Sequence, residues 1–138
     1  MAALTITEDN IVPVTTGALY NAQVGIAAVT IAKGKSVYKL SDGTVGLADA
    51  NAATPAFIAK GISITSAVAG QPVYYQIAGD LDFGAILTTN VLYIVGATAG
   101  SINPITDLAQ GWYGCHLGYA ITTSRMTLNV FNTGVALA

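Results

Sequence analysis

Short runs of Val, Ile, Thr and Tyr alternate along this chain with turns rich in Gly, Asn and Asp. β-Branched and aromatic residues favour strands, and these turn residues favour tight connections between strands. The segments 36–40 and 44–48, for example, flank the triplet 41–43, Ser-Asp-Gly, and an Asp-Gly pair supplies the backbone conformation that a hairpin turn needs. The spacing predicts an all-β fold, a compact β-barrel or β-sandwich.

Strands are expected at 25–32, 36–40, 44–48, 57–66, 72–78, 81–87, 91–95, 113–122 and 126–131, and loops or single turns at 48–55 and 105–110. Neighbouring residues of a strand point to opposite faces. Strict alternation therefore places Tyr74 and Gln76 on one face of their strand and Val73 on the other. The same rule places Lys60 and Ile62 on one face of the strand expected at 57–66.

Charge is scarce: only 9% of the residues are charged, against about 25% in a typical soluble domain. The net charge of −2 argues against a nucleic-acid partner, which requires clustered Lys and Arg. Lys33, Lys35 and Lys39 do cluster, but Asp42 and Asp49 follow them closely. We interpret that segment as a solvated turn and not as a phosphate site.

No segment has the pattern of a membrane span. The longest apolar run, 24–32, contains Thr30 and stops at Lys33, whereas a spanning helix needs about 20 apolar residues. The N-terminus has neither the basic start nor the apolar stretch of a signal peptide, and the single Cys115 has no partner for an internal disulfide. We expect no membrane partner and synthesis in a cytoplasm.

Hydrophobic residues nevertheless make up 53% of the chain. Large exposed apolar patches promote aggregation, so a chain with so few charges is expected to bury part of its surface in a permanent interface. This composition predicts a protein whose partners are other protein subunits.

The N-terminal residues 1–24 differ from the remainder, 25–138, which we expect to form a single β domain. In residues 1–24, apolar and polar residues alternate around Pro13, and no nearby segment is an evident hairpin partner. Such a segment is typical of an extended arm that a partner captures. The predicted contact residues of this arm are Ile6, Ile11, Val12 and Val14.

A weak internal repeat suggests a duplication. Three pairs of segments match in order and at similar spacing: 36–40 with 90–94, 61–65 with 118–122, and 73–77 with 126–130. The repeat predicts two duplicated β-units, at about 30–83 and 84–138. One such unit could not bury both faces of its sheet, but two packed together could.

Residues able to carry chemistry are few. Cys115 and His116 are adjacent, so in a strand they point to opposite faces and cannot act as a nucleophile and its base. Asp80 and Asp82 would share a face, but no calcium-binding loop accompanies them. We expect no catalytic, cofactor or metal site, and we predict that the chain is not an enzyme. An enzyme would instead bury His116 beside a carboxylate.

The aromatic residues near the C-terminus are open to two interpretations. Trp112 and Tyr113 could form a platform on which a sugar ring stacks, or they could belong to the core or to a subunit interface. We take Trp112, Tyr113 and Tyr119 as candidates for the contact between subunits.

The turn-rich runs at 30–55, 59–73 and 92–104, with connections such as Ala69-Gly70-Gln71-Pro72-Val73, resemble the small head decoration (capsid cement) proteins of tailed bacteriophages. The resemblance extends over about 25–135 and rests on turn chemistry. It implies a β-barrel or sandwich that binds the major capsid protein on the outside of the virion, often as a homotrimer. It implies no cofactor and no catalytic residues. Phage head-fibre, tail or baseplate modules, including glycan-binding ones, have similar sequences and are the alternative.

Overall fold

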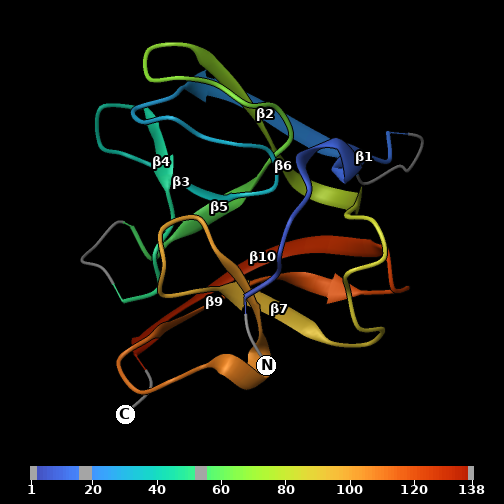
Figure 1. Ribbon diagram of the computed structural model, residues 1–138. Coiled ribbons are helices and arrows are strands. Elements are labelled where there is room, and N and C mark those ends of the chain that lie inside the picture. Colours follow the sequence, from blue (N-terminus) through green and yellow to red (C-terminus); the bar gives the residue numbers. More distant parts are fainter. Residues whose placement is uncertain (1–2, 16–19, 52–55, 137–138) are drawn as a thin grey trace.

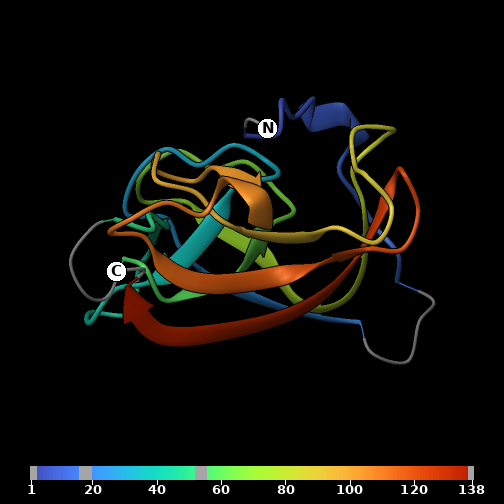
Figure 2. The same ribbon diagram turned by 90° about the horizontal axis from the view of Figure 1, so that it is seen from below.

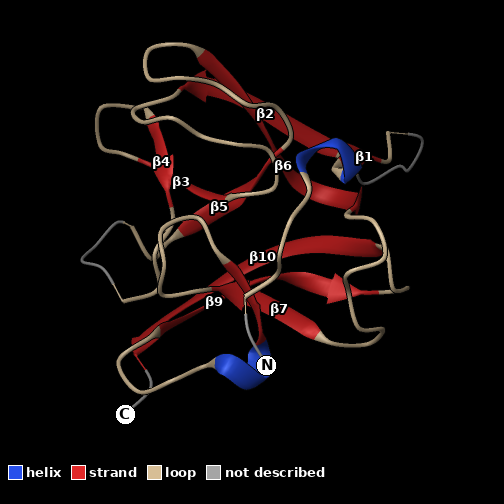
Figure 3. Cartoon of the chain, viewed as in Figure 1, coloured by secondary structure: helices blue, strands red, loops and turns tan. Residues whose placement is uncertain are grey.

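The computed structural model describes residues 3–15, 20–51 and 56–136 of the chain (Figure 1). These residues form strands and two single-turn 3₁₀ helices, and they include no α-helix (Figure 3). The helical turns are Glu8–Asn10 and Ile105–Asp107. The strands are β1 (Val12–Pro13), β2 (Asn21–Ile26), β3 (Ser36–Lys39), β4 (Val45–Leu47), β5 (Ala59–Ser63), β6 (Pro72–Asp82), β7 (Leu92–Val95), β8 (Ile102–Pro104), β9 (Tyr113–Ala120) and β10 (Arg125–Ala136).

The strands form one antiparallel sheet with the order β4-β3-β5-β6-β10-β9-β7-β8, and β1 and β2 also pair with β6. The sheet curls into a half-barrel, with β2 to β6 in the upper part of Figure 1 and β7, β9 and β10 in the lower part. The turned view shows β9 and β10 curving together along one side (Figure 2). The predicted all-β fold is confirmed.

The long strand β6 holds this arrangement together, because it pairs with four other strands. Tyr75 and Gln76 face both β2 and β5, whereas Leu81 and Asp82 face both β1 and β10. Between these two regions, the Gln76 side chain donates hydrogen bonds from Nε2 to the carbonyl oxygens of Ala78 (3.1 Å) and Asp80 (2.8 Å). A buried side chain therefore supports the backbone where β6 passes from one set of partners to the next.

The two halves of the sheet have the same connectivity. In the first half a hairpin (β3, β4) is followed by β5 beside β3 and by β6 beside β5. In the second half the hairpin β7–β8 is followed by β9 beside β7 and by β10 beside β9. A duplication of units 30–83 and 84–138 would produce this arrangement, with β6 and β10 meeting at the centre.

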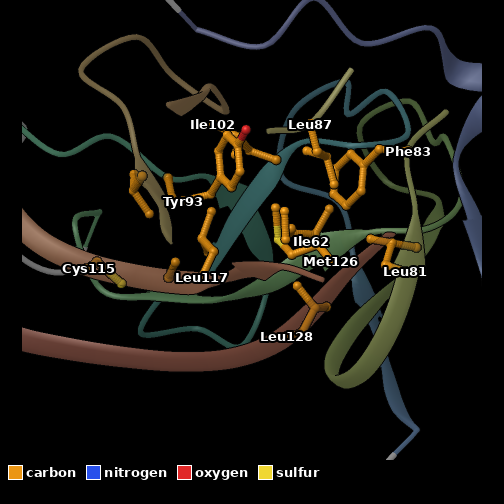
Figure 4. Packing of buried hydrophobic residues seen from close by; sticks show 14 of the residues in the cluster. Ile62, Leu81, Phe83, Leu87, Tyr93, Ile102, Cys115, Leu117, Met126 and Leu128 are labelled. Atoms are coloured by element: carbon orange, nitrogen blue, oxygen red, sulfur yellow. The ribbon is translucent and has the colours of Figure 1, made fainter. Parts of the chain in front are cut away.

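The core consists of two clusters of buried side chains. The larger lies inside the curl between the halves and is shown in Figure 4; its largest members include Ile62, Leu81, Phe83, Tyr93, Leu117 and Met126. The smaller cluster lies between β3, β6 and the loop after β2, and it contains Ile31, Val37, Val73 and Tyr75. Burying each of these large side chains stabilises the fold by about 1.5–3 kcal/mol.

The hairpin expected at residues 36–48 is present as β3 and β4. The Asp42 carboxylate accepts hydrogen bonds from the backbone N–H (3.0 Å) and the hydroxyl (2.6 Å) of Thr44, which hold the pKa of Asp42 below its ordinary value. Gly43 adopts a φ of +88°, a conformation that residues with a side chain rarely take. Local turn chemistry thus determines this part of the fold.

Three strand predictions need correction. The strand expected at 25–32 instead starts at Asn21 and ends at Ile26. The strand expected at 81–87 is the end of β6: it stops at Asp82, whose carboxylate accepts a hydrogen bond from the N–H of Gly84 (3.0 Å) and turns the chain. The short strand β8 was not expected, because a three-residue segment ending in Asn-Pro has the composition of a turn.

The predicted shared face of Lys60 and Ile62 is wrong. Ala59 and Ile62 are buried in the core, whereas Lys60 is exposed. Val37 and Tyr38 of β3 pair with Gly61 and Ala59, so Lys60 is an extra residue in β5, a β-bulge. A bulge reverses the alternation of faces, which strict period-two reasoning cannot anticipate.

The structure does not confirm an extended arm at residues 1–24. The N–H of Leu4 donates to the carbonyl of Ile102 (2.8 Å), and Ile11 is only 2% exposed within the core. Strands β1 and β2 both pair with β6. Most of the alternating apolar residues of this segment thus serve the protein's own core, and the segment contributes two strands whose partner, β6, lies far along the chain.

Two glycines of the repeat, Gly61 in β5 and Gly118 in β9, lie where strands approach most closely. A Cβ atom at Gly61 would collide with the carbonyl oxygen of Gln76, and one at Gly118 with that of Thr127. We expect Gly61→Ala or Gly118→Ala to lower the free energy of unfolding by about 3 kcal/mol. The added Cβ atom would force β5 away from β6 in the first variant, and β9 away from β10 in the second. Urea denaturation measures this loss.

Gly114→Ala is the matched control in β9, since its Cβ would lie 3.1 Å from the Thr133 hydroxyl oxygen, a side-chain atom that can move. Its cost is expected to stay within about 1 kcal/mol. Equal losses for Gly114→Ala and Gly118→Ala would contradict the close approach of β9 and β10.

Candidate interaction surface

Large hydrophobic side chains that are more than a third exposed are the most prominent feature of the surface. Among the described residues they are Val12, Val24, Ile26, Val29, Val68, Tyr74, Tyr119, Ile121, Phe131 and Val135. Most of them lie in strands or in the turns that join strands. They are the candidates for contacts with other subunits.

One group lies across β2 and β6 and is called here the β2–β6 patch: Val24, Ile26 and Tyr74. Val24 is the direct cross-strand partner of Tyr74, and they are 53% and 48% exposed. Ile26, two residues after Val24, lies on the same face. Cross-strand neighbours are about 5 Å apart, so these side chains form one continuous apolar area.

A second group, the β9–β10 patch, consists of His116 and Tyr119 on β9 and Phe131 on β10. Phe131 is 60% exposed and is the cross-strand partner of His116, whose ring centroid lies 5.9 Å from that of Phe131. Tyr119 is 47% exposed farther along the same strand. The sequence did not single out Phe131, although its position at the end of an expected strand was a signal.

The three predicted interface aromatics do not meet at one place. Tyr113 is half-buried and stacks on Phe57 at a centroid distance of 3.9 Å, and Trp112 packs against the larger core cluster. Tyr119 lies six residues from Tyr113 along β9, a separation of about 20 Å. Only Tyr119 belongs to an exposed patch, and one ring face of Tyr113, which a stacked sugar would need, is already covered.

The predicted arm residues also divide into two kinds. Ile11 is buried, and Ile6 packs against the same core cluster. Val14 is half-buried, and its N–H donates to the carbonyl of Asp80 (3.0 Å). Val12, by contrast, is 53% exposed on β1 and is available for a contact. The structure therefore leaves Val12 as the arm residue best placed to touch a partner.

A cleft of about 570 Å³ opens where β10 separates from β6. The ladder between these strands ends at the pair Asn129 and Ala78. Beyond it, the cleft lies between Tyr75 and Ile77 on one side and Val130 on the other. The Tyr75 hydroxyl donates to Gln23 Oε1 (3.2 Å), and burial raises the pKa of Tyr75.

The residues considered for catalysis remain apart. Cys115 is fully buried and His116 lies on the outer face against Phe131, as the alternation of faces predicted. Burial raises the pKa of Cys115, and a backbone hydrogen bond from Ala59 offsets part of the rise. A protonated, buried thiol is a poor nucleophile. Within the described part of the chain, no three His, Cys, Asp or Glu side chains gather where they could hold a metal ion.

No helix among the described residues is long and apolar enough to span a membrane. Comparison with protein-family models, with curated proteins and with solved structures gives no match to this chain. The resemblance to phage decoration proteins therefore stays a prediction from the turn-rich segments of the sequence.

The buried thiol gives a pH dependence. In the unfolded chain Cys115 ionises near its ordinary pKa of 9.0, whereas in the fold it stays protonated at higher pH. The contribution of the buried, protonated thiol to stability is therefore fully present below the unfolded pKa. It is lost as the pH rises through the folded pKa. Between about pH 8 and about pH 10, we expect the free energy of unfolding of the wild type to fall more steeply with pH than that of Cys115→Ala.

Urea denaturation of the two proteins at each pH measures the difference. Parallel curves for wild type and Cys115→Ala would contradict the burial of this thiol in a site that excludes its charged form.

Proposed function

We propose that this chain is a structural protein of a phage virion that binds the outer surface of the capsid through the major capsid protein and stabilises the shell. The observation that supports this best is the pair of apolar patches on an exposed sheet surface of a chain with only 9% charged residues. Apolar patches with few surrounding charges are typical of protein–protein contacts.

The β2–β6 patch and Val12 are the proposed contact with the capsid. Val12 and Val24 belong to the N-terminal segment 1–24 that the sequence suggested for this role, and they lie on β1 and β2, which both pair with β6. The contact does not require the arm to leave the domain. Moving Ile11 out of the core to reach a partner would cost about 2–3 kcal/mol of burial, so we assign Ile6 and Ile11 to the fold.

The β9–β10 patch is the proposed contact between subunits of a homotrimer. It contains Tyr119, which the sequence suggested for this interface, together with Phe131. Aromatic residues that are half exposed in a single subunit are enriched at such contacts.

Binding on the outside of a shell would stabilise it by mass action. A subunit that binds only the assembled shell lowers the free energy of that state and not of its separated parts. Many copies placed by the symmetry of the shell multiply a modest interface. Neither effect requires turnover or a cofactor.

The first test is the mass of the purified protein by light scattering, followed by co-sedimentation with empty expanded phage capsids. The wild type is expected to be bound at a fixed number of copies per shell. Val24→Glu/Tyr74→Glu should bind at least about tenfold more weakly, because two charges would be buried at the contact. Ile121→Glu, at an exposed position outside both patches, is the matched control and should bind as the wild type does.

A wild type that forms a stable trimer but ignores capsids would contradict the proposal. Binding to a glycan array would then favour the alternative, a fibre, tail or baseplate module. Full binding by Val24→Glu/Tyr74→Glu would contradict the role of the β2–β6 patch.

A further inference from the structure

The cleft between β6 and β10 exposes part of a strand edge. β10 pairs with β6 only from Arg125 to Asn129, whereas its pairing with β9 continues to Ala136. Beyond Asn129, over more than half of the sheet's longest strand, β9 is thus the one strand paired with β10 in the described part of the chain. The opposite edge of this part of β10 faces the cleft.

This edge lacks two of the usual kinds of protection against pairing with other chains. Natural sheets block exposed edges with charged side chains, proline, β-bulges or a covering segment, and of these the described part of β10 has irregularities after Leu128 and after Asn132 in its pairing with β9. The sequence from Met126 to the C-terminus contains no charged side chain and no proline. Phe131 and Val135 on this strand are 60% and 67% exposed, so the edge is apolar as well.

The walls of the cleft carry positive charge. Lys39 at the end of β3 and Lys60 at the β5 bulge both line it, and they are two of the five cationic side chains in the chain. None of the described residues that line the cleft is acidic. Clefts lined by one sign of charge attract ligands of the opposite sign.

The bulge explains how Lys60 reaches this position. Because it is the extra residue in β5, Lys60 stands out of the alternation that buries Ala59 and Ile62. The same irregularity that corrected the predicted face of Lys60 therefore brings it into the cleft with Lys39. Ile58 and Ile77 provide apolar walls beside the two ammonium groups.

We infer that this cleft binds an extended, acidic segment of a partner protein, which adds a strand to the cleft-facing edge of β10 and places a carboxylate between Lys39 and Lys60. The inference rests on the proposed function, which makes the partner a protein. It adds that the bound segment of that partner is extended and acidic. Strand addition draws its affinity from main-chain hydrogen bonds and its specificity from pockets for alternate side chains.

Charge argues against a second copy of this chain as the occupant. Two copies joined edge to edge through their β10 strands would bring two lysine-lined clefts together, and like charges at a contact disfavour it. A carboxylate-bearing strand would instead neutralise the cleft.

Synthetic peptides test the inference without a capsid. The probe is a blocked, fluorescent decapeptide of alternating Thr and Val with Asp at its two central polar positions, and the matched peptides carry Asn there or a central Pro. We expect the Asp peptide to bind roughly fivefold more tightly than the Asn peptide, with the difference lost in Lys39→Gln/Lys60→Gln or in high salt. The Pro peptide should not bind, because it cannot complete the ladder.

Amide shifts in an NMR titration locate the site, and they are expected at 130–135 of β10. Equal affinity for the Asp and Asn peptides, no binding of any peptide, or shifts confined to other strands would overturn the inference. So would a mass that doubles with concentration while the same amides shift without peptide, which would assign the edge to a second copy.

Capsid binding then separates the two proposals. If the wild type binds capsids, Lys39→Gln/Lys60→Gln should bind more weakly, and Lys33→Gln/Lys35→Gln, which removes the same charge outside the cleft, should not. Equal binding by both variants would overturn the acidic-segment inference while the decoration function stands. If the wild type ignores capsids, the decoration function fails, and the peptide titration alone decides the chemistry of the cleft.

Discussion

The backbone hydrogen bonds of β6 are the interaction on which the rest of the structure depends. Its eleven residues pair with β1, β2, β5 and β10, and thereby join both halves of the sheet to the N-terminal segment. The arrangement is possible because the partners change along the strand, and Gln76 supports the backbone at the change. Backbone hydrogen bonds between loops also join the two hairpin-containing halves, among them those from the Gly100 N–H to the carbonyl of Ala48 (2.7 Å) and from the Ala50 N–H to the carbonyl of Gly96 (2.8 Å), but the strand ladder between the halves is that of β6 with β10.

The same arrangement accounts for the surface. A strand that changes partners cannot stay paired with β10 along its full length, so the sheet divides after Asn129 and closes only as a half-barrel. The division leaves a lysine-lined cleft beside one edge of β10, and two apolar patches lie elsewhere on the described surface of the sheet. Each of these features suits contact with another protein. The single cysteine and the single histidine, by contrast, lie on opposite faces of β9.

Local patterns in the sequence predicted what local chemistry determines. The Asp42-Gly43 hairpin, the exposure of Tyr74 opposite Val73 and the separation of Cys115 from His116 all follow from neighbouring residues. The pairing of β2 with β6 could not be predicted in this way, because Val24 and its partner Tyr74 are far apart in the chain. The β2–β6 patch was missed for the same reason. The cleft was missed because it depends on the bulge at Lys60 and on the end of the β6–β10 ladder at Asn129.

Amide hydrogen exchange of the free protein, followed residue by residue by NMR, tests most directly whether β6 organises the fold and leaves β10 open. The amides of Tyr75, Gln76 and Leu81 should exchange only through global unfolding and be the slowest in the chain. Those at 130–135 should exchange roughly a hundredfold faster through local opening. Protection at 130–135 equal to that of β6, or faster exchange in β6 than in the β3–β4 hairpin, would contradict the account.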